Sequence, residues 1–417
     1  MFKKVNAWLH LWLGISSGII VVIVSITGCI YVFENEIRGL YEPWRFVKVQ
    51  NKTFVKPSEL LAAASPFLKD QKPTSIIYNP KGESSEVASY NRKEGSFINI
   101  YVNPYTANVL KVKSGSRRNS EFDFFRFILN GHRALWLPYP IGRPIVGVGV
   151  LIFVFLLISG LILWWPKKLN KSNINKSFKI NWGAKFKRVN YDFHNVLGFY
   201  SMIFLLFISL TGLVWSFEWF SKSLYWVTTG GNTLVERNRL KSDTTNLSDF
   251  QTSNIDKVWF SLSKKPNEGM YITVPKKPAD VLGATLYLRS GTYYKTDVYS
   301  FDQKTLKPLK SSGPFAGKYD QASIGDKLRR MNYDIHIGAI LGIPGKIIAF
   351  LVSLISASLP ITGFVIWWGK NKKSKRKTKN HKDERLKAIS EEQLNIKHTP
   401  PIKRRNVAIT QLNINKQ

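Results

Sequence analysis

Cysteine and histidine are both scarce in this 417-residue chain, which has one cysteine, Cys29, and six histidines. A single cysteine excludes an intramolecular disulfide, an iron–sulfur cluster held by several thiolates, and haem attachment through a C-x-x-C-H motif. Residues 1–29 resemble a lipoprotein signal cleaved before Cys29, but the apolar run continues through Phe33. The preceding Thr27-Gly28 step recurs at Thr211-Gly212, where no cleavage is possible, so helix packing through small residues explains both copies better.

Four apolar runs contain no charged residue. They are Leu11 to Phe33, Ile145 to Trp165, Val196 to Phe217, and Ile347 to Trp368. A helix of about 20 such residues, at a rise of about 1.5 Å per residue, crosses the roughly 30 Å of a bilayer's hydrocarbon core. The sequence therefore predicts an α-helical membrane protein with four transmembrane helices and the lipid bilayer as its surroundings.

Acidic residues are also few, since 27 aspartates and glutamates stand against 61 lysines and arginines, a formal net charge of +34. We expect no nucleic-acid partner, because a basic excess near membrane helices is more often a topology signal. Basic residues gather at 3–4, at 167–188 with eight and no acid, and at 370–379 with seven. With four spans these segments share one side, so we expect the inner (cytoplasmic) membrane of a bacterium with both termini in the cytoplasm.

This topology divides the chain into eight segments. Transmembrane helices are expected within residues 1–33, 145–165, 196–217 and 347–368. Two extracytoplasmic α+β domains, each ending in an interfacial helix before the next span, are expected at 34–144 and 218–346. Residues 166–195 form a basic cytoplasmic loop, and residues 369–417 form a basic cytoplasmic tail that we expect to be disordered, because it is polar and Lys-rich after Lys379.

The outward domains contain the periodicities of strands and of short helices. One helix is predicted at Pro57 to Leu68, and strands at 74–78, 86–91, 96–102, 109–112, 270–274, 284–289 and 293–301, with a short one beyond. Amphipathic helices are predicted at Glu121 to Leu137 and Ile324 to Leu341. Breakers that include Pro144 and Pro344 should separate these two helices from the spans that follow.

The first and third spans repeat the same landmarks. His10 is followed at +4 by Gly14 and at +17 and +18 by Thr27-Gly28, and His194 is followed at the same offsets by Gly198 and Thr211-Gly212. The second and fourth spans also match, because Ser159-Gly160 and Thr362-Gly363 each precede a Trp-Trp pair by the same step. The sequence therefore predicts two parallel repeats, each with two spans.

Four of the six histidines occupy equivalent places in these repeats. An axis along the membrane normal pairs His10 with His194 near the cytoplasmic face, which we name the inner pair. It pairs His132 with His336 near the outer face, which we name the outer pair. A lone histidine near a helix end is usually structural, but polar groups at duplicated positions in or near membrane spans tend to mark function.

A pair of facing imidazoles suits haem iron, which takes axial ligands from both sides of the ring. Zinc or copper would need more ligands, and the spans offer no carboxylate or thiol cluster. Small residues in the spans either open room for a flat macrocycle or let the helices approach closely. They are Gly14, Ser17, Gly18, Gly147, Gly149 and Gly198.

Arginines and tryptophans near the two pairs have two interpretations each. Near the outer pair, arginines pair either with haem propionates or with lipid headgroups, and they are Arg133, Arg143, Arg329 and Arg330. Trp164 and Trp367 belong either to an interfacial aromatic belt or to the surroundings of a porphyrin near the inner pair. The outward domains contain no Ser/His/Asp or Cys/His set, so catalysis by these domains alone is not expected.

Several motifs resemble the PepSY-associated transmembrane family over residues 1 to about 370. They are Trp8-Leu9-His10-Leu11-Trp12-Leu13-Gly14, His132-Arg133 with Gly142-Arg143-Pro144-Ile145-Val146-Gly147, and Tyr191-Asp192-Phe193-His194-Asn195-Val196-Leu197-Gly198. The stretch Ile100 to Leu110 resembles the end of a PepSY domain, with Ala107-Asn108 where the family often has Gly-Glu. The resemblance implies PepSY-like outward domains.

The resemblance further implies a di-haem electron-transfer protein similar to inner-membrane ferrisiderophore reductases. Two b-type haems would be held by the inner and outer pairs, and Fe(III) in a siderophore or other ferric chelate would be reduced on the outer side. No Gly-rich dinucleotide fingerprint follows a predicted strand, so the electron donor would be a quinol or a cytoplasmic flavoprotein. The alternative is a non-redox PepSY membrane protein that binds or inhibits a peptidase, in which the histidines are structural.

Overall fold

The computed structural model describes residues 1–116, 122–166, 168, 170–244 and 252–397. Within this part of the chain, four helical segments are long and apolar enough to cross a membrane: Phe2–Tyr31, Tyr139–Trp164, Phe186–Ser216 and Ile343–Asn371. The prediction of four membrane helices is therefore confirmed. The chain divides into a compact unit of residues 1–363 and a C-terminal unit of residues 364–417, which are described separately.

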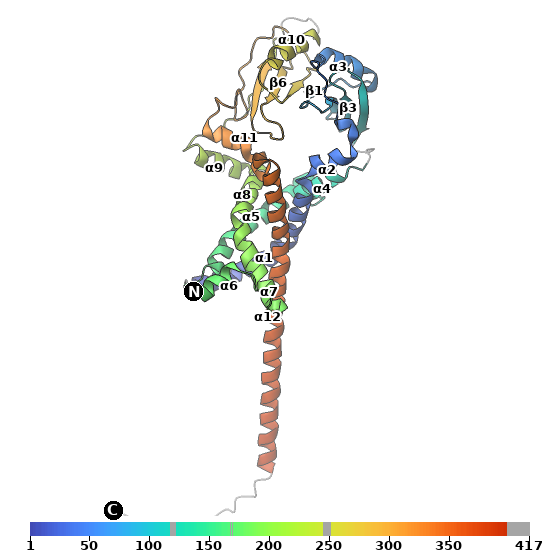
Figure 1. Ribbon diagram of the computed structural model, residues 1–417. Helices are drawn as coiled ribbons and strands as arrows, with labels where there is room; N and C mark the ends of the chain where they lie inside the picture. Colours follow the sequence, from blue (N-terminus) through green and yellow to red (C-terminus); the bar gives the residue numbers. More distant parts are fainter. Residues whose placement is uncertain (117–121, 167, 169, 245–251, 398–417) are drawn as a thin grey trace, which may run out of the picture. The chain divides into compact units, whose positions relative to one another are not determined.

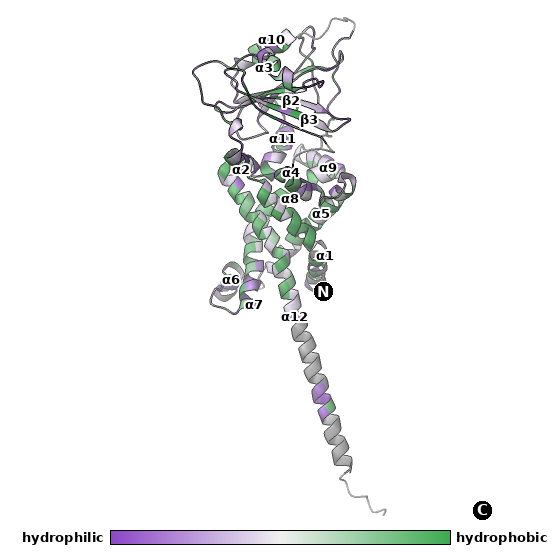
Figure 2. Cartoon of the chain, turned by 90° about the vertical axis from the view of Figure 1, so that its right-hand side faces the viewer, coloured by the Kyte–Doolittle hydropathy of each residue, from purple (hydrophilic) through white to green (hydrophobic). Residues whose placement is uncertain are grey.

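The spans of the first unit form a bundle of α1 (Phe2–Tyr31), α5 (Tyr139–Trp164), α8 (Gly198–Ser216) and the start of α12 (Ile343–Lys397). All four contribute to one apolar core, made by Val21, Phe153, Leu157, Leu205 and Val352. The third span begins with α7 (Phe186–Asp192) and a π-helical turn η3 (Phe193–Leu197) before α8. In Figure 2 hydrophobic residues are concentrated along α1, α5 and α8.

Two predicted helix boundaries are wrong. The second span begins at Tyr139, before Ile145, with Pro140 in its first turn and Pro144 inside the helix. The fourth begins at Ile343, with Pro344 as its second residue. Proline in a first turn costs no hydrogen bond, because the amide it lacks would have no intrahelical partner there.

The tail also differs from the prediction of disorder. Helix α12 continues from its membrane segment to Lys397, and residues 398–417 lie outside the described part of the chain. Between Lys370 and Lys397 there is no glycine or proline to stop the helix. Lysine, arginine and glutamate, which are abundant there, are good helix formers.

The polar segments form one seven-stranded antiparallel sheet, in the order β4-β3-β2-β1-β5-β6-β7. Its strands are β1 (Ser75–Tyr78), β2 (Ser85–Asn91), β3 (Ser96–Val102), β4 (Val109–Gly115), β5 (Gly269–Thr273), β6 (Leu282–Tyr287) and β7 (Thr296–Phe301). Seven of the predicted strands are confirmed to within a few residues, whereas the short strand expected beyond Phe301 is present only as an isolated bridge between Phe301 and Pro308. The expected separation into two domains is wrong, because β1 pairs with β5. This pairing removes the open edge that each half would otherwise expose.

Two helices cover one face of the sheet, α3 (Pro57–Ala64) from the first half and α10 (Thr252–Ser263) from the second (Figure 1). Alternate strand residues point into this core, as Ile98, Ile100 and Val102 do on β3. Leu60, Ile76 and Val87 pack in the same cluster as Ile255, Ile272 and Leu286. The two halves therefore share one hydrophobic core. Helix α10 was not predicted from the sequence. The helix predicted at Pro57 to Leu68 is present as α3 followed by the 3-10 turn η2 (Ser65–Phe67).

Short helices connect the sheet to the bundle. These are α2 (Glu34–Tyr41), η1 (Pro43–Arg45), α4 (Phe124–Ala134), α9 (Glu218–Thr228), α11 (Ile324–His336) and η4 (Ala339–Leu341). At the other end of the spans, α6 (Lys171–Phe178) lies in the loop between the second and third spans. The amphipathic helices predicted around His132 and His336 are present as α4 and α11, although both are shorter than expected. Helix α4 packs on α1, and α11 packs on α8.

A crosslink tests the joined sheet. Ser75 lies directly opposite Thr273 in the register of β1 with β5. In a Cys29→Ser background, Ser75→Cys with Thr273→Cys should form a disulfide, because opposite residues in neighbouring strands have Cβ atoms about 4.5–5.5 Å apart and a small shift reaches disulfide range. After cleavage at a protease site inserted at Gly183, the two halves should migrate as one band until they are reduced.

The matched control is Ser75→Cys with Thr285→Cys on β6, which lies two strands away from β1. These two cysteines should stay uncrosslinked, because neighbouring strands are about 4.8 Å apart and two steps exceed disulfide reach. Separate halves in the Ser75/Thr273 pair under oxidising conditions would contradict the single sheet.

Candidate functional site

The inner pair brings together the first and third spans. His10 lies on α1 and His194 on the π-helical turn η3, with ring centroids 6.4 Å apart and ring planes at 90°. His10 Nδ1 lies 2.8 Å from Ser159 Oγ on α5, and His194 Nδ1 lies 3.0 Å from Thr362 Oγ1 on α12. Each ring is therefore held by a span other than its own.

The hydrogen bonds of these hydroxyls define the imidazole tautomers. Ser159 Oγ donates to the Leu156 carbonyl at 3.1 Å, and Thr362 Oγ1 donates to the Ser358 carbonyl at 3.0 Å. Since the hydroxyl protons are used within their own helices, the oxygens accept from Nδ1–H of the histidines. The lone pair of each inner imidazole is thus on Nε2, the atom available to a metal.

The outer pair is formed by α4 and α11. The ring centroids of His132 and His336 are 6.1 Å apart, with ring planes at 65°. His132 Nδ1 donates to the Val24 carbonyl and His336 Nδ1 to the Ile208 carbonyl, both at 2.9 Å. A carbonyl can only accept, so Nε2 again carries the lone pair.

The outer imidazoles are held neutral by their surroundings. Burial lowers the pKa of His132, and burial together with the neighbouring His132 lowers that of His336 to about 3. A neutral imidazole is the form that binds metals.

Each of the four rings is seated on a Ser/Thr-Gly step. Thr27-Gly28 contacts His132, Ser159-Gly160 contacts His10, Thr211-Gly212 contacts His336, and Thr362-Gly363 contacts His194. A Cβ placed on any of these glycines would lie 3.1–3.3 Å from the Cε1 atom of the ring. The hydroxyl and the missing side chain together position the imidazole. Sequence analysis attributed these steps to helix packing and missed this role, although their repetition signalled it.

An asparagine one helical turn before the histidine strengthens three of these contacts. Asn6 Nδ2 donates to the Ser159 carbonyl at 3.1 Å, Asn190 to the Thr362 carbonyl at 3.0 Å, and Asn332 to the Thr211 carbonyl at 3.2 Å. Residues four apart share a helix face, so Asn and His contact the same step together. The Asn-x3-His spacing was visible in the sequence but was not used.

The helix α4 has Ile128 at the corresponding position and is anchored differently. Asp123 caps its N-terminus by accepting from the Arg126 amide at 3.0 Å, and accepts from Arg38 of α2 at 2.7 and 2.8 Å. These bonds join α4 to the short helix that leads into the sheet.

Both ring separations fit two ligands of one metal ion. A metal–imidazole bond is about 2.0 Å long and the bonding nitrogen lies roughly 1 Å from the ring centroid, so opposed imidazoles place their centroids roughly 6 Å apart. Among the described residues no group of three or more His, Cys, Asp or Glu side chains could hold a metal ion. A pair that supplies only two axial nitrogens fits a haem, whose ring provides the remaining four.

The small residues of the spans divide into two groups. A Cβ on Gly147 would lie 2.8 Å from Phe217 and Ser216, and one on Gly149 would lie 2.7 Å from Ile20, so these glycines allow close helix contacts. A Cβ on Gly18 would lie 3.2 Å from the Pro360 side chain. Positions 14 and 198, one turn after the inner histidines, are more open, with nearest atoms 3.9 and 3.6 Å from such a Cβ. Ser17 and Ser201 bond to their own helices.

The predicted arginines have protein partners. Arg133 donates to Tyr139 OH at 3.0 Å, and Arg143 donates to the Trp215 carbonyl. Arg330 is 2% exposed and donates to the carbonyls of Thr296, Pro314 and Ala316 at 2.6–2.9 Å. Arg330 therefore holds a loop onto α11, a role that is neither the propionate nor the lipid-headgroup interpretation. Arg329 is half-buried, and burial lowers its pKa.

The predicted tryptophans contact other aromatic residues. Trp164 stacks on Phe199 at 3.8 Å and donates Nε1–H to the Ser177 carbonyl. In the C-terminal unit, Trp367 packs against Phe364. A tryptophan that the sequence did not single out, Trp215, meets His336 edge to face at 5.1 Å.

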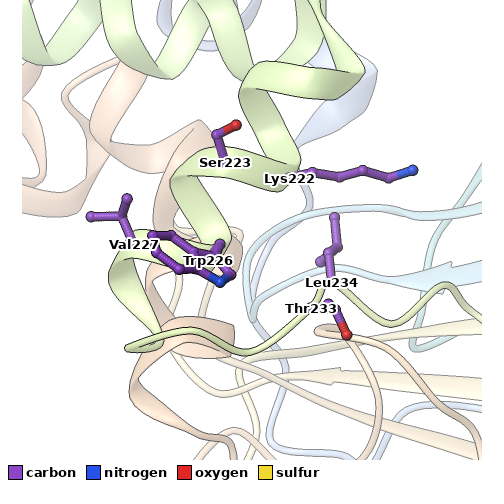
Figure 3. A pocket seen from close by; sticks show the side chains of 6 residues that line it. All are labelled: Lys222, Ser223, Trp226, Val227, Thr233 and Leu234. Atoms are coloured by element: carbon purple, nitrogen blue, oxygen red, sulfur yellow. The ribbon is translucent and has the colours of Figure 1, made fainter.

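A pocket of about 640 Å³ lies beside α9 (Figure 3). Its lining contains no histidine, cysteine or carboxylate and none of the predicted site residues, so it is separate from the two pairs. It is lined by Lys222, Ser223, Trp226, Val227, Thr233 and Leu234.

Comparison with known proteins gives one match. The family model described as the PepSY-associated TM region matches residues 7–370, a range that includes most or all of each span, both histidine pairs and the whole sheet. No curated protein matches the chain.

The asparagine contact can be tested on α11. Asn332 is buried, so Asn332→Ala should remove a bond that joins α11 to α8 and loosen the helix carrying His336. A lost hydrogen bond of about 1 kcal/mol corresponds to roughly fivefold faster amide exchange in residues 324–336. Asn267→Ala, which removes only a local bond to the Lys265 carbonyl, should leave this exchange unchanged. Equal protection of α11 in both variants would contradict the positioning role.

Proposed function

The chain belongs to the PepSY-associated transmembrane family, and from that premise we propose that it is a di-haem electron-transfer protein of the membrane. It would act as a haem-dependent ferric reductase that takes electrons from one side and reduces ferric siderophores or other ferric chelates on the other. The observation that carries this proposal is the presence of two facing histidine pairs, each with the separation and the tautomer of axial haem ligands.

The residues around each pair support a b-type haem, which would supply one-electron storage at its iron. The two imidazoles of each pair would hold the haem iron through Nε2, and their Nδ1–H bonds to hydroxyls and carbonyls orient the rings and would raise ligand basicity. The apolar spans around the inner pair exclude water. The four histidines lie on four different helical elements, α1, η3, α4 and α11, and each bonds to another helix, so that folding of the bundle assembles both sites together.

The proposed direction follows from the charges. The basic segments at residues 3–4, 167–188 and 370–379 favour a cytoplasmic location for both termini in a bacterial inner membrane, with the sheet outside. The inner pair then accepts electrons from a quinol or a cytoplasmic flavoprotein. The outer pair, built from helices that connect to the sheet, faces the ferric chelate. Reduction to Fe(II) weakens the hold of a siderophore on its iron, so the proposed role is iron acquisition.

Haem content tests the proposal. Purified protein expressed with ample haem should contain two b-type haems per chain in a pyridine-haemochrome assay. His10→Ala or His194→Ala should remove one haem and leave the outer one, whereas His132→Ala or His336→Ala should remove the other. The control is His381→Ala, in the basic tail, which should retain both haems. Absence of a Soret band from the parent would contradict the redox function and leave the peptidase-binding alternative.

Reporter fusions test the proposed sidedness. Fusions after Lys3, Lys176 and Lys379 should report the cytoplasm, because basic flanks are retained there. Fusions near Gly82 and Gly291, which lie in turns of the sheet, should report the outer side. A disagreement within either group would break the assignment of the inner and outer pairs to opposite faces.

A further inference from the structure

Two arginines meet at one tyrosine where the second span begins. Arg133, on α4, donates from Nη2 to Tyr139 OH at 3.0 Å, and its guanidinium carbon lies 5.3 Å from the centre of the Tyr139 ring. Arg143, one helical turn after Tyr139 on α5, has its guanidinium carbon 5.7 Å from the same ring centre. Both contacts are within the range of a cation–π interaction. We name these three side chains the arginine–tyrosine cluster.

Neither guanidinium of the cluster forms an ion pair with a carboxylate in the described part of the chain. Arg143 donates to a carbonyl of α8, but its Nε is buried and has no hydrogen-bond partner. Burial raises the pKa of Tyr333, and Glu34 and Asp334 add to this rise while Arg133 opposes it. These two carboxylates bind elsewhere, to an arginine of α2 and to a backbone amide of the turn between β6 and β7. The protein therefore satisfies the two cations of the cluster only in part.

The equivalent cation of the second repeat is neutralised within the protein. Arg143 precedes the Ser159-Gly160 step by 16 residues, and Lys346 precedes Thr362-Gly363 by the same number. Lys346 is 8% exposed and forms an ion pair of 2.6 Å with Glu36 of α2. Two cations at matching places in the fold thus differ in their partners. The carboxylate that one of them has inside the protein must, for Arg143, be replaced by an anion from outside.

The arginine–tyrosine cluster lies at the boundary of the membrane. Tyr139 is the first residue of the second span, and His132, next to Arg133, donates to the Val24 carbonyl within the first span. Exposed apolar side chains of the same segment are Trp136, Leu137 and Ile141. Aromatic residues gather at the level of the lipid headgroups, and arginine side chains reach to that level from the apolar region. The anion available there is the phosphate of a lipid.

We propose that the arginine–tyrosine cluster binds the phosphate of an anionic phospholipid. A guanidinium presents its N–H donors in a fork that matches phosphate oxygens. The ammonium group of a zwitterionic lipid would meet two cations, so the cluster prefers a lipid with net negative charge, such as phosphatidylglycerol. Because Arg133 belongs to α4 and Arg143 to α5, one bound lipid joins the helix that carries His132 to the second span. This inference does not rest on the proposed function.

The test uses the full-length protein in a non-ionic detergent, stripped of lipid, and native mass spectrometry with two lipids of identical acyl chains. The parent should bind phosphatidylglycerol more tightly than phosphatidylcholine. Arg133→Gln and Arg143→Gln should each weaken phosphatidylglycerol binding by about fivefold, the contribution of one cation at a lipid surface, and leave phosphatidylcholine binding unchanged. The matched control is Arg126→Gln, an exposed arginine on the same helix outside the cluster, which should bind both lipids like the parent.

Four results would overturn the lipid site. The first is a parent without preference for phosphatidylglycerol, and the second is parent-like binding by both glutamine variants. Excess inorganic phosphate that displaces phosphatidylglycerol would assign the cluster to free phosphate. Loss of haem from the variants with unchanged phosphatidylglycerol binding would assign the arginines to haem propionates. Circular dichroism verifies the fold of each variant, and if Arg143→Gln does not fold, the exposed Arg133→Gln decides the outcome. A parent that binds phosphatidylglycerol through the cluster but carries no haem would support this site while contradicting the proposed redox function.

Discussion

The structure depends on one kind of contact, in which a histidine from one helix is seated on a Ser/Thr-Gly step of another. The glycine lets the ring approach to van der Waals distance, and the hydroxyl or an adjacent carbonyl accepts its Nδ1–H bond. Apolar helices in lipid gain little from hydrophobic contact with one another, so small residues and interhelical hydrogen bonds carry much of the specificity. The contacts that position the imidazoles are therefore also contacts that hold the bundle.

This arrangement links the sheet to the two histidine pairs. The outer histidines are not in the spans but on α4 and α11, which reach the bundle from the sheet side and contact α1 and α8. Both helices are also tied to the sheet region, α4 at its N-cap through Asp123 with Arg38, and α11 through Asp334, two residues before His336, with the Tyr293 amide. Because β1 pairs with β5, the sheet in turn holds the two halves together. Displacement of either half would disturb the outer pair.

The two sites differ in what surrounds them. Both inner Nδ1 atoms face hydroxyls on neighbouring spans, and His194 lies in a π-helical turn, a local widening of the helix often found at functional positions. Both outer Nδ1 atoms bond directly to backbone carbonyls of α1 and α8, with threonine hydroxyls beside them. Trp215 and Tyr333 then continue from His336 toward the solvent. Among the described residues, a ring contact leads on from an imidazole to a further aromatic residue only at His336 of the outer pair.

Local patterns in the sequence determined the four spans, the seven strands and the identity of the four repeated histidines. Uncharged runs and alternating residues such as Ile98, Ile100 and Val102 act within one segment, so they can be recognised without knowledge of neighbours. Local rules failed where a neighbouring strand or the position of a residue within its helix mattered, as at Pro344 in a first turn and at the β1–β5 edge. Tertiary structure alone decided that two halves share one sheet, that Arg330 binds a loop, and that Thr27-Gly28 seats His132, 104 residues away. These features depend on distances between segments remote in the chain, which no local periodicity records.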